Sequence, residues 1–339
     1  MSKTSAPITV LMPAYNAEKY IGEAIESILN QSFSDFELMI IDDGCSDNTM
    51  NIVDSFKDAR IRVVTNEKNL GLIATLNKGL SLIKTEFVAR MDADDISLPK
   101  RLETQLKFMR ANPDVGVCGT WYDNILPDGS EKKGGRYLPG HNEILFKNLY
   151  QLHMIHGTTM MRMQIIRDNN LSFNPSFSHA EDYDFFARFA ELSKLHNVQE
   201  SLYIIRHHGE SVSKKFSDVQ IDNSNRVKTR IFNQIGISVT EQQLTSYLEL
   251  MHQNYGAIGG EKRTGLLQLL TDLIEANETS NYLPSAYLRK EISVRVLHMF
   301  NNQSKTEKGL FSELNRFKHT SFSDNPKLFL TTYGKVLFA

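Results

Sequence analysis

Two aspartates one residue apart follow a short apolar segment in the first third of the chain. Asp92 and Asp94 come after residues 87–91, Phe-Val-Ala-Arg-Met, which have the composition of a buried strand. In open parallel sheets, ligands bind beyond the carboxyl ends of the strands. Two carboxylates at this spacing can address a divalent cation, and hard oxygen ligands suit Mg²⁺ or Mn²⁺ bridged to a diphosphate. The spacing therefore predicts metal chemistry rather than nucleophilic catalysis.

Polar residues also follow two earlier apolar segments. Residues 13–16, Pro-Ala-Tyr-Asn, come after the apolar residues 8–12. Residues 42–44, Asp-Asp-Gly, come after the apolar residues 38–41. Each group alone is explained by turn formation, because Asp and Asn are common where a strand ends. Three such ends on one face would gather carboxylates that repel one another unless a cation or hydrogen-bond donors compensate them.

The phosphate-binding loops of common nucleotide-binding enzymes are absent from the sequence. It contains no Gly-x-x-x-x-Gly-Lys-Ser/Thr segment, and no Gly-x-Gly-x-x-Gly follows the first predicted strand. Neither a P-loop enzyme nor a nicotinamide dehydrogenase is therefore supported. A nucleotidyltransferase on a similar sheet would need a glycine-rich and basic loop after that strand, and this is missing as well.

The elements that must position the polar residues alternate between strands and amphipathic helices, the pattern of βαβ units. The predicted strands of the first third are residues 8–12, 38–41, 61–65 and 87–91. The predicted helices after residue 216 are 219–235, 241–252, 262–276, 285–300 and 308–317. We predict an α/β protein with a Rossmann-like, mostly parallel sheet flanked by helices over residues 1–215. A helical C-terminal domain is predicted over residues 216–339.

Composition excludes several classes of protein. The 339 residues include 38 Lys and Arg against 40 Asp and Glu, and the net charge of −2 gives no field that would gather nucleic acid. Cys45 and Cys118 have no partner at ligand spacing, which argues against a disulfide framework and a zinc site and fits a reducing cytosol. No stretch reaches the ~20 apolar residues of a spanning helix, so we expect a soluble protein or one peripheral to a membrane.

Six segments are specific as a set in their order and spacing. They are residues 10–16 (VLMPAYN), 27–33 (SILNQSF), 37–47 (ELMIIDDGCSD), 69–71 with Asn77, 92–95 (DADD) and 181–182 (ED). Together they resemble the inverting glycosyltransferases of family 2, which have the GT-A fold, over about residues 7–215. Cys45 departs from this family, whose members more often have Ser or a similar small polar residue there, and we expect the change to affect packing only.

The resemblance implies a role for each matching residue. Those that would line the nucleotide pocket are Pro13, Ala14, Tyr15, Glu18 and Asp43. Asp43 would accept a hydrogen bond from the uracil N3–H of a UDP-sugar. Asp92 would contact the ribose or the metal, and Asp94 would ligate the Mn²⁺ or Mg²⁺ that neutralises the leaving diphosphate. Asp182 would be the general base that removes the proton of the acceptor hydroxyl in a single, inverting displacement.

Asp182 and two further residues, Arg90 and Trp121, also have structural interpretations. Asp182 begins a predicted helix, where a carboxylate complements the helix dipole, although the resemblance favours the base. Arg90 points toward the same strand ends and could contact phosphate, and a salt bridge to a neighbouring acid is the alternative. Trp121, the only tryptophan, is expected in packing rather than as a platform for a sugar.

Two groups of histidines are candidates for binding. Residues 206–213, Arg-His-His-Gly-Glu-Ser-Val-Ser, resemble the closing Arg-x-His-x-x-Ser segment of the family, a loop over the donor diphosphate. His208 is the better match and could contact metal or phosphate, with simple solvation as the alternative, while His207 is the weaker candidate. His153 and His156 occur where family members shape the acceptor pocket, and a core or turn position would explain them equally.

We therefore predict a GT-A hexosyltransferase that moves a hexose or N-acetylhexosamine from a nucleotide sugar, UDP-linked, to a glycan hydroxyl. Such enzymes build surface polysaccharide or lipopolysaccharide on lipid-linked precursors, so a cytoplasmic location at the inner face of the membrane is expected. The alternative is a catalytically silent protein that acts through a partner-binding C-terminal module. The complete set of Asp92, Asp94 and Asp182 argues against it, because a chain freed from catalysis has no physical need for all three.

The C-terminal region contains apolar stripes that must be buried. Residues 266–274, with five leucines and an isoleucine, would pack within the chain or on another chain, with packing inside the chain as the default. Residues 327–339 mix basic and large apolar residues. Membrane-surface docking, a homodimer contact and docking within the chain are the three alternatives for this stretch.

Overall fold

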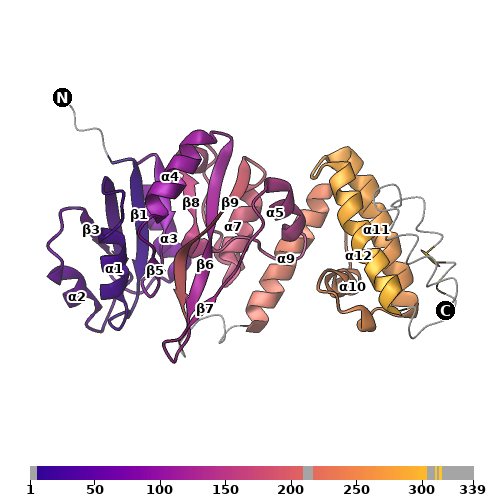
Figure 1. Ribbon diagram of the computed structural model, residues 1–339, viewed down its shortest axis with the longest axis horizontal. Coiled ribbons are helices and arrows are strands. Elements are labelled where there is room, and N and C mark those ends of the chain that lie inside the picture. The colour runs from indigo at the N-terminus through magenta and orange to yellow at the C-terminus, as the bar shows by residue number, and fades with distance from the viewer. Residues whose placement is uncertain (1–5, 209–216, 304–309, 311–312, 315–339) are drawn as a thin grey trace. The chain divides into compact units, whose positions relative to one another are not determined.

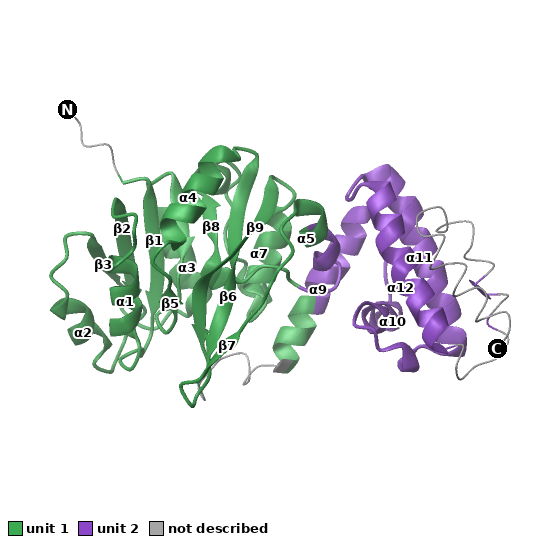
Figure 2. Ribbon diagram, viewed as in Figure 1, with its two compact units in different colours: residues 1–144, 152–224 green, residues 145–151, 225–339 purple. Residues whose placement is uncertain are grey.

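The computed structural model describes residues 6–208, 217–303, 310 and 313–314 (Figure 1). The chain divides into two compact units (Figure 2). The sheet unit comprises residues 1–144 and 152–224, and the helical unit comprises residues 145–151 and 225–339. Every site residue predicted from the sequence belongs to the sheet unit.

The described part of the sheet unit forms one nine-stranded sheet in the order β3-β2-β1-β4-β8-β6-β9-β5, with β7 paired to β6. The first four strands are β1 (Ile8–Ala14), β2 (Phe36–Asp42), β3 (Ile61–Thr65) and β4 (Phe87–Arg90). All four pair in parallel, as the sequence predicts. Parallel strands end at the same edge, so the polar residues after β1, β2 and β4 lie along one edge of the sheet.

The second half of the sheet is mixed, which differs from the expectation of a mostly parallel sheet. Its strands are β5 (Ile96–Ser97), β6 (Val115–Ile125), β7 (Glu131–Lys133), β8 (Met160–Arg162) and β9 (Lys194–Arg206). β8 lies antiparallel between β4 and β6, and β9 pairs in parallel with β6 and antiparallel with β5. Strands as short as β5 and β8 carry no periodicity, so the sequence did not reveal them.

Helices cover both faces of this sheet (Figure 1). The helices of the chain up to residue 189 are α1 (Ile21–Leu29), α2 (Thr49–Ser55), α3 (Leu72–Leu82), α4 (Arg101–Ala111), α5 (His141–Asn148, which enters the helical unit at residue 145), η1 (His156–Thr158), α6 (Met163–Asp168), η2 (Pro175–Phe177) and α7 (Glu181–Phe189). Side chains of α1, α2 and α4 share one apolar core with Val10, whereas α3, α6 and α7 share another with Leu11. Neighbouring residues of β1 thus face opposite cores, because side chains alternate along a strand.

The helical unit is built from amphipathic helices that pack on one another. Its elements are α9 (Ser217–Ile235, from residue 225), α10 (Glu241–Met251), η3 (Tyr255–Ala257), α11 (Gly260–Ser280) and α12 (Ser285–Gln303). The apolar stripe of α11, including Leu266, Leu270 and Leu273, is buried, and α11 packs against α10 and α12. Packing within the chain therefore accounts for this stripe. Most of the predicted helix at 308–317 and all of residues 327–339 lie outside the described residues.

None of the helices in the described part of the chain is both long and apolar enough to cross a membrane.

Candidate active site

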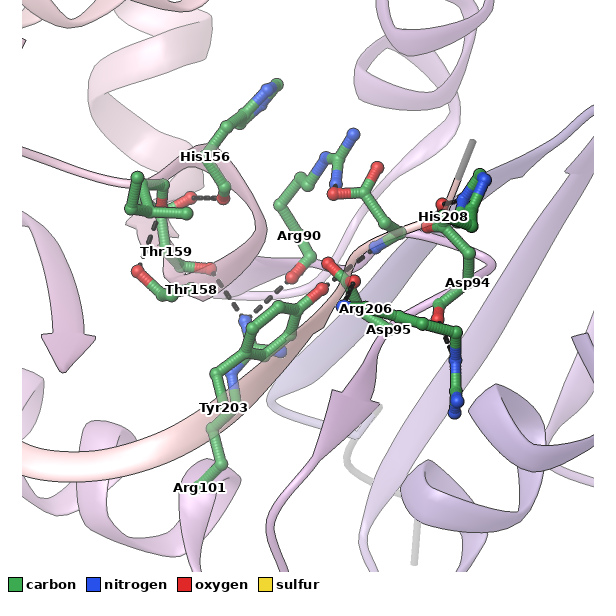
Figure 3. A network of polar contacts seen from close by, with 12 residues as sticks. Arg90, Asp94, Asp95, Arg101, His156, Thr158, Thr159, Tyr203, Arg206 and His208 are labelled. Carbon is green, nitrogen blue, oxygen red and sulfur yellow. Dashed lines mark hydrogen bonds and ion pairs between the residues drawn. The ribbon is translucent and has the colours of Figure 1, made fainter. Parts of the chain in front are cut away.

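The loop after β4 carries the acidic pair, and its two carboxylates have different partners (Figure 3). Asp92 forms an ion pair with the guanidinium of Arg90, whose side chain is only 3% exposed. Oδ2 of Asp94 lies 2.9 Å from Nε2 of His208, and the Asp94 side chain is 36% exposed. Arg90 therefore forms the salt bridge that was its alternative interpretation. Asp94 is the carboxylate of the pair that contacts a histidine.

Strand β9 holds the acidic loop in place. The backbone N–H of Arg206 donates to Oδ1 of Asp95 at 2.9 Å, and Nε of Arg206 donates to the carbonyl oxygen of Asp94 at 3.1 Å. The N–H of Asp92 donates to the hydroxyl of Tyr203 at 3.1 Å. Burial, together with the charges of Asp92 and Asp94, raises the pKa of Asp95 well above its usual range. Asp95 is thus a buried structural carboxyl group.

Guanidinium groups compensate the charge of the acidic loop. Arg90 and Arg206 contact it directly, and the fully buried Arg101 lies alongside. Arg101 donates to the carbonyl oxygen of Arg90 at 2.6 Å, and its guanidinium carbon is 4.9 Å from the centre of the Tyr203 ring. Burial lowers the pKa of Arg101 to about 10, so the group stays charged at neutral pH. These cations offset the repulsion expected where several carboxylates meet.

The donor atoms at Asp94 and His208 fit a divalent cation that arrives with a diphosphate. The His208 ring stacks on the Tyr20 ring with 5.1 Å between centroids. The guanidinium carbon of Arg206 lies 5.1 Å from the centre of the Tyr20 ring. Magnesium is commonly held by one or two carboxylates plus substrate phosphates and water, and manganese also prefers such oxygen ligands. Among the described residues, no group of three His, Cys, Asp or Glu side chains could hold a metal by itself. Asp92, the second predicted ligand, is already paired with a guanidinium.

Asp43, directly after β2, is held by the loop that follows β3. Its Oδ1 accepts from Nδ2 of Asn66 at 2.8 Å and from the N–H of Leu70 at 2.9 Å, and its Oδ2 accepts from the N–H of Gly71 at 3.0 Å. Gly44 has a φ of +75°, and an added Cβ would lie 2.7 Å from backbone atoms of the same loop. A carboxylate has about four acceptor positions, so roughly one position of Asp43 is left for a ligand.

The loops after β1 and β2 are joined by reciprocal hydrogen bonds. Oε2 of Glu18 accepts from the N–H of Asn48 at 2.9 Å, and the N–H of Glu18 donates to Oδ2 of Asp47 at 3.1 Å. Sγ of Cys45 accepts from the N–H of Asn16 at 3.4 Å, and burial raises the pKa of this thiol to about 11. Glu18 thus connects two loops, and Cys45 stays an unreactive thiol that packs between them.

The remaining predicted pocket residues lie at the end of β1. Pro13 and Ala14 are its last two residues, and the carbonyl oxygen of Ala14 accepts from the N–H of Asp43 at 2.9 Å. Tyr15 follows with 51% of its surface exposed. A large exposed ring beside two strand ends is available to contact a ligand.

Asp182 lies in the first turn of α7, where both of its predicted interpretations have support. Its Oδ1 accepts from the N–H of Tyr183 at 2.7 Å, a contact at the helix N-terminus. Burial and the neighbouring carboxyl group of Glu181 raise the pKa of Asp182 to about 7, while the charge of Arg90 opposes this rise. A carboxyl group that titrates near neutral pH is suited to general-base catalysis. The charge of Arg90 thus acts on Asp182 as well as on Asp92 of the acidic loop.

The other candidate histidines have structural partners. His156 is buried, and burial together with the charge of Arg90 lowers its pKa well below its usual range. Nε2 of His153 accepts from the N–H of Leu138 at 2.8 Å. A ring nitrogen of His207 lies 2.7 Å from a side-chain oxygen on β6. Of the four histidines, His208 is the one that contacts the acidic loop. Residues 209–213 of its predicted segment lie outside the described part of the chain.

Several residues that support the site were not identified from the sequence, because they match no motif. They include Tyr20, Arg101 and Tyr203, which contact His208, Arg90 and the acidic loop respectively. Arg101 offered one signal, since a charged residue stands next to the apolar stripe of its helix. Tyr203 and Tyr20 offered none, because their roles depend on contacts between elements distant in sequence.

The parallel strand ends with their acidic loop, and the helical layers on both faces, are typical of α/β folds that bind a ligand at the carboxyl ends of the strands. A model of glycosyl transferase family 2 matches residues 9–169. A glycosyltransferase of Haemophilus influenzae, described as uncharacterized, is 32% identical over 72% of this chain and 80% of that protein. The O-antigen biosynthesis glycosyltransferase WbnJ of Escherichia coli is 34% identical over 61% of this chain and 82% of its own. The chain belongs to glycosyltransferase family 2.

A solved structure supports the assignment of the fold. The TarS protein of S. aureus, residues 1–349 in complex with UDP-GlcNAc, aligns over 86% of both chains with a TM-score of 0.57 and 20% identity. The GT-A fold implied by the resemblance and the helical C-terminal region predicted from the sequence pattern are thereby confirmed.

Proposed function

We propose that this glycosyltransferase moves a hexose or N-acetylhexosamine from a UDP-sugar to a glycan hydroxyl, with inversion at the anomeric carbon. The observation that carries the proposal is that the charge of Arg90 acts on Asp182, in the first turn of α7, while Arg90 pairs with Asp92 of the acidic loop, in which Asp94 faces His208. The similarity to WbnJ, an O-antigen biosynthesis enzyme, supports a role in surface polysaccharide or lipopolysaccharide synthesis. The fold shared with TarS, which binds UDP-GlcNAc, is consistent with a UDP-linked donor.

The nucleotide would lie along the ends of β1 and β2. Tyr15 exposes its ring there, and the remaining acceptor position of Asp43 suits the N3–H of a uracil. Pro13 and Ala14 would shape the wall of this pocket, and Glu18 would keep its two loops together. Each of these contacts involves the base or ribose, so they would set nucleotide affinity rather than the rate of transfer.

Asp94 and His208 would hold Mn²⁺ or Mg²⁺, with Asp92 next to them. When bound, the cation would neutralise charge that develops on the leaving diphosphate. The side chain of Arg206 keeps Asp94 in place by a hydrogen bond to the carbonyl oxygen of Asp94. Stacking on the Tyr20 ring keeps the imidazole of His208 in place.

Asp182 would take the proton of the acceptor hydroxyl. As the acceptor oxygen forms a bond to C1 of the sugar, the bond from C1 to the phosphate oxygen breaks, and the nucleoside diphosphate leaves with that electron pair. The acceptor proton ends on the Asp182 carboxylate. A single displacement of this kind inverts the configuration at C1.

The stereochemistry and the donor can be tested together. A panel of UDP- and GDP-sugars is first screened for slow hydrolysis without an acceptor, in the presence of Mn²⁺. We expect a UDP-sugar to be hydrolysed fastest, and we expect NMR of the new glycosidic linkage, formed when that donor is supplied with a glycan acceptor, to show the anomer opposite to that of the donor. Retention of the donor's anomer would contradict a single displacement, and a preference for GDP-sugars would contradict the proposed nucleotide.

The pH dependence of transfer should report the pair formed by Glu181 and Asp182. Because the base must be ionised and its pKa is about 7, kcat/KM should fall about tenfold per pH unit below pH 7. Glu181→Gln removes a neighbouring carboxylate that raises this pKa, so the acidic limb should move to lower pH. A pH profile of both proteins measures the shift, and an unmoved limb would show that Glu181 does not influence the base.

A further inference from the structure

A buried amide, that of Asn66 directly after β3, fixes the carboxylate of Asp43. Nδ2 of Asn66 donates to Oδ1 of Asp43 at 2.8 Å and to Oγ1 of Thr75 at 3.0 Å. Oδ1 of Asn66 accepts from Nζ of Lys78 at 2.6 Å. Because a lysine side chain only donates, the amide oxygen must face Lys78 and the amide nitrogen must face Asp43. The amide therefore cannot turn over and present its oxygen to the carboxylate.

The two oxygens of the Asp43 carboxylate are unequally occupied. Oδ1 accepts from Asn66 and from the N–H of Leu70 at 2.9 Å, which uses both of its acceptor positions. Among the described residues, the N–H of Gly71 is the one group that donates to Oδ2, at 3.0 Å. The free acceptor position of Asp43 is therefore on Oδ2.

Open space lies next to Gly71, the residue that binds Oδ2. Gly71 has a φ of +84°, and a Cβ added to it would meet no atom within 4 Å outside its chain neighbours. The side chains on either side of it in the chain, Leu70 and Leu72, are both exposed. A flat base that enters this space would lie next to apolar side chains and within reach of Oδ2.

A carboxylate with one free position distinguishes nucleobases by the donors on their edges. Uracil offers one donor, N3–H, between two carbonyl oxygens, whereas guanine offers two adjacent donors, N1–H and the 2-amino group. If guanine N1–H bound Oδ2, its 2-amino group would face the occupied Oδ1 and the N–H donors of Asn66 and Leu70. Asp43 is only 4% exposed, so little water is available there to compensate an unpaired donor.

We propose that Asn66 is a specificity-determining residue of the donor site, which excludes guanine nucleotides because it occupies an acceptor position on Oδ1 of Asp43. The inference rests on the proposed function, because it takes Asp43 as the residue that binds the base of the donor. It goes beyond that function by naming the residue that would have to change for a guanine nucleotide to bind. Asn66 does not contact the base and acts through Asp43.

Two purine nucleotides of nearly the same size test the number of free acceptor positions. Guanosine diphosphate (GDP) and inosine diphosphate (IDP) differ only in the 2-amino group, and both are titrated calorimetrically with Mg²⁺, beside UDP. The wild type should bind UDP most tightly and GDP more weakly than IDP. Asn66→Ala frees a position on Oδ1, so the ratio of GDP to IDP affinity should rise roughly tenfold or more, the equivalent of one gained hydrogen bond. A purely structural role would weaken all three nucleotides in proportion and leave this ratio unchanged.

Thr75→Val is the matched control within the same buried network. It removes the other partner of the Asn66 amide and keeps the bond to Asp43, so the ratio of GDP to IDP affinity should stay as in the wild type. An unchanged ratio in Asn66→Ala would overturn the proposal. So would an Asn66→Ala chain that binds UDP but neither purine, because the size of the pocket would then select the base.

The wild type alone gives a test that does not depend on the folding of a variant. Tighter binding of GDP than of IDP by the wild type would overturn the proposal, because it would show a free acceptor for the 2-amino group. Failure of the wild type to bind UDP would instead count against the proposed donor.

Discussion

Asp182→Asn is expected to lower kcat for sugar transfer by roughly 10³-fold, within the range that a general base contributes. The amide has nearly the same shape as the carboxylate but cannot take the acceptor proton at neutral pH. The base acts only as the new bond forms, so the affinity for UDP should change by less than about threefold. Steady-state transfer to a glycan acceptor and calorimetric titration of UDP measure the two effects. The matched control is Asp168→Asn, an exposed aspartate in the same unit, which should keep wild-type activity.

The stability of the folded chain offers a second, independent measure of the protonation of Asp182. The pKa of Asp182 is raised from 3.8 to about 7, so the folded chain holds this proton more tightly than the unfolded chain does. The stability of the folded state therefore falls as the pH rises through this interval, and the penalty is complete above about pH 7. Asp182→Asn removes the penalty, so its Tm should exceed that of the wild type near pH 8, with a smaller difference near pH 5. A lower Tm at pH 8 together with weakened UDP binding would identify Asp182 as a structural helix cap instead.

Asp94→Ala is expected to lower transfer by roughly 10²-fold or more, because assistance by a metal contributes several kcal/mol to the departure of a diphosphate. The variant should also lose most of the rise in Tm that UDP with Mn²⁺ produces in the wild type, since ligand binding to the folded state raises stability. His208→Ala should show a smaller loss of the same kind, because it leaves the carboxylate in place.

Chelation and a matched variant complete this test. EDTA should abolish transfer by the wild type, and Mn²⁺ or Mg²⁺ should restore it. Asp128→Ala, at an exposed turn of the sheet unit, should respond to UDP and Mn²⁺ like the wild type. Full turnover of the wild type in EDTA would rule out the metal, whatever the activity of Asp94→Ala.

The parallel half of the fold could be read from local patterns. Three of the first four strands, β1, β2 and β4, are largely apolar runs buried by helices on both faces, and such a run is visible within a few residues of sequence. The acidic and polar residues after these strands were found for the same reason, because a strand end is a local feature. In the mixed half, β8 escaped detection, since it gains its place only by pairing with β4 and β6.

By itself, the sequence determined the strand ends, the acidic pair, Asp182 and the family, because each is a matter of residue type and short spacing. The tertiary structure decided which of these residues meet. It paired Asp92 with Arg90, left Asp94 facing His208, and assigned residues 145–151 to the helical unit. Such pairings depend on how burial and charge are balanced across the whole sheet, and no local pattern carries that information.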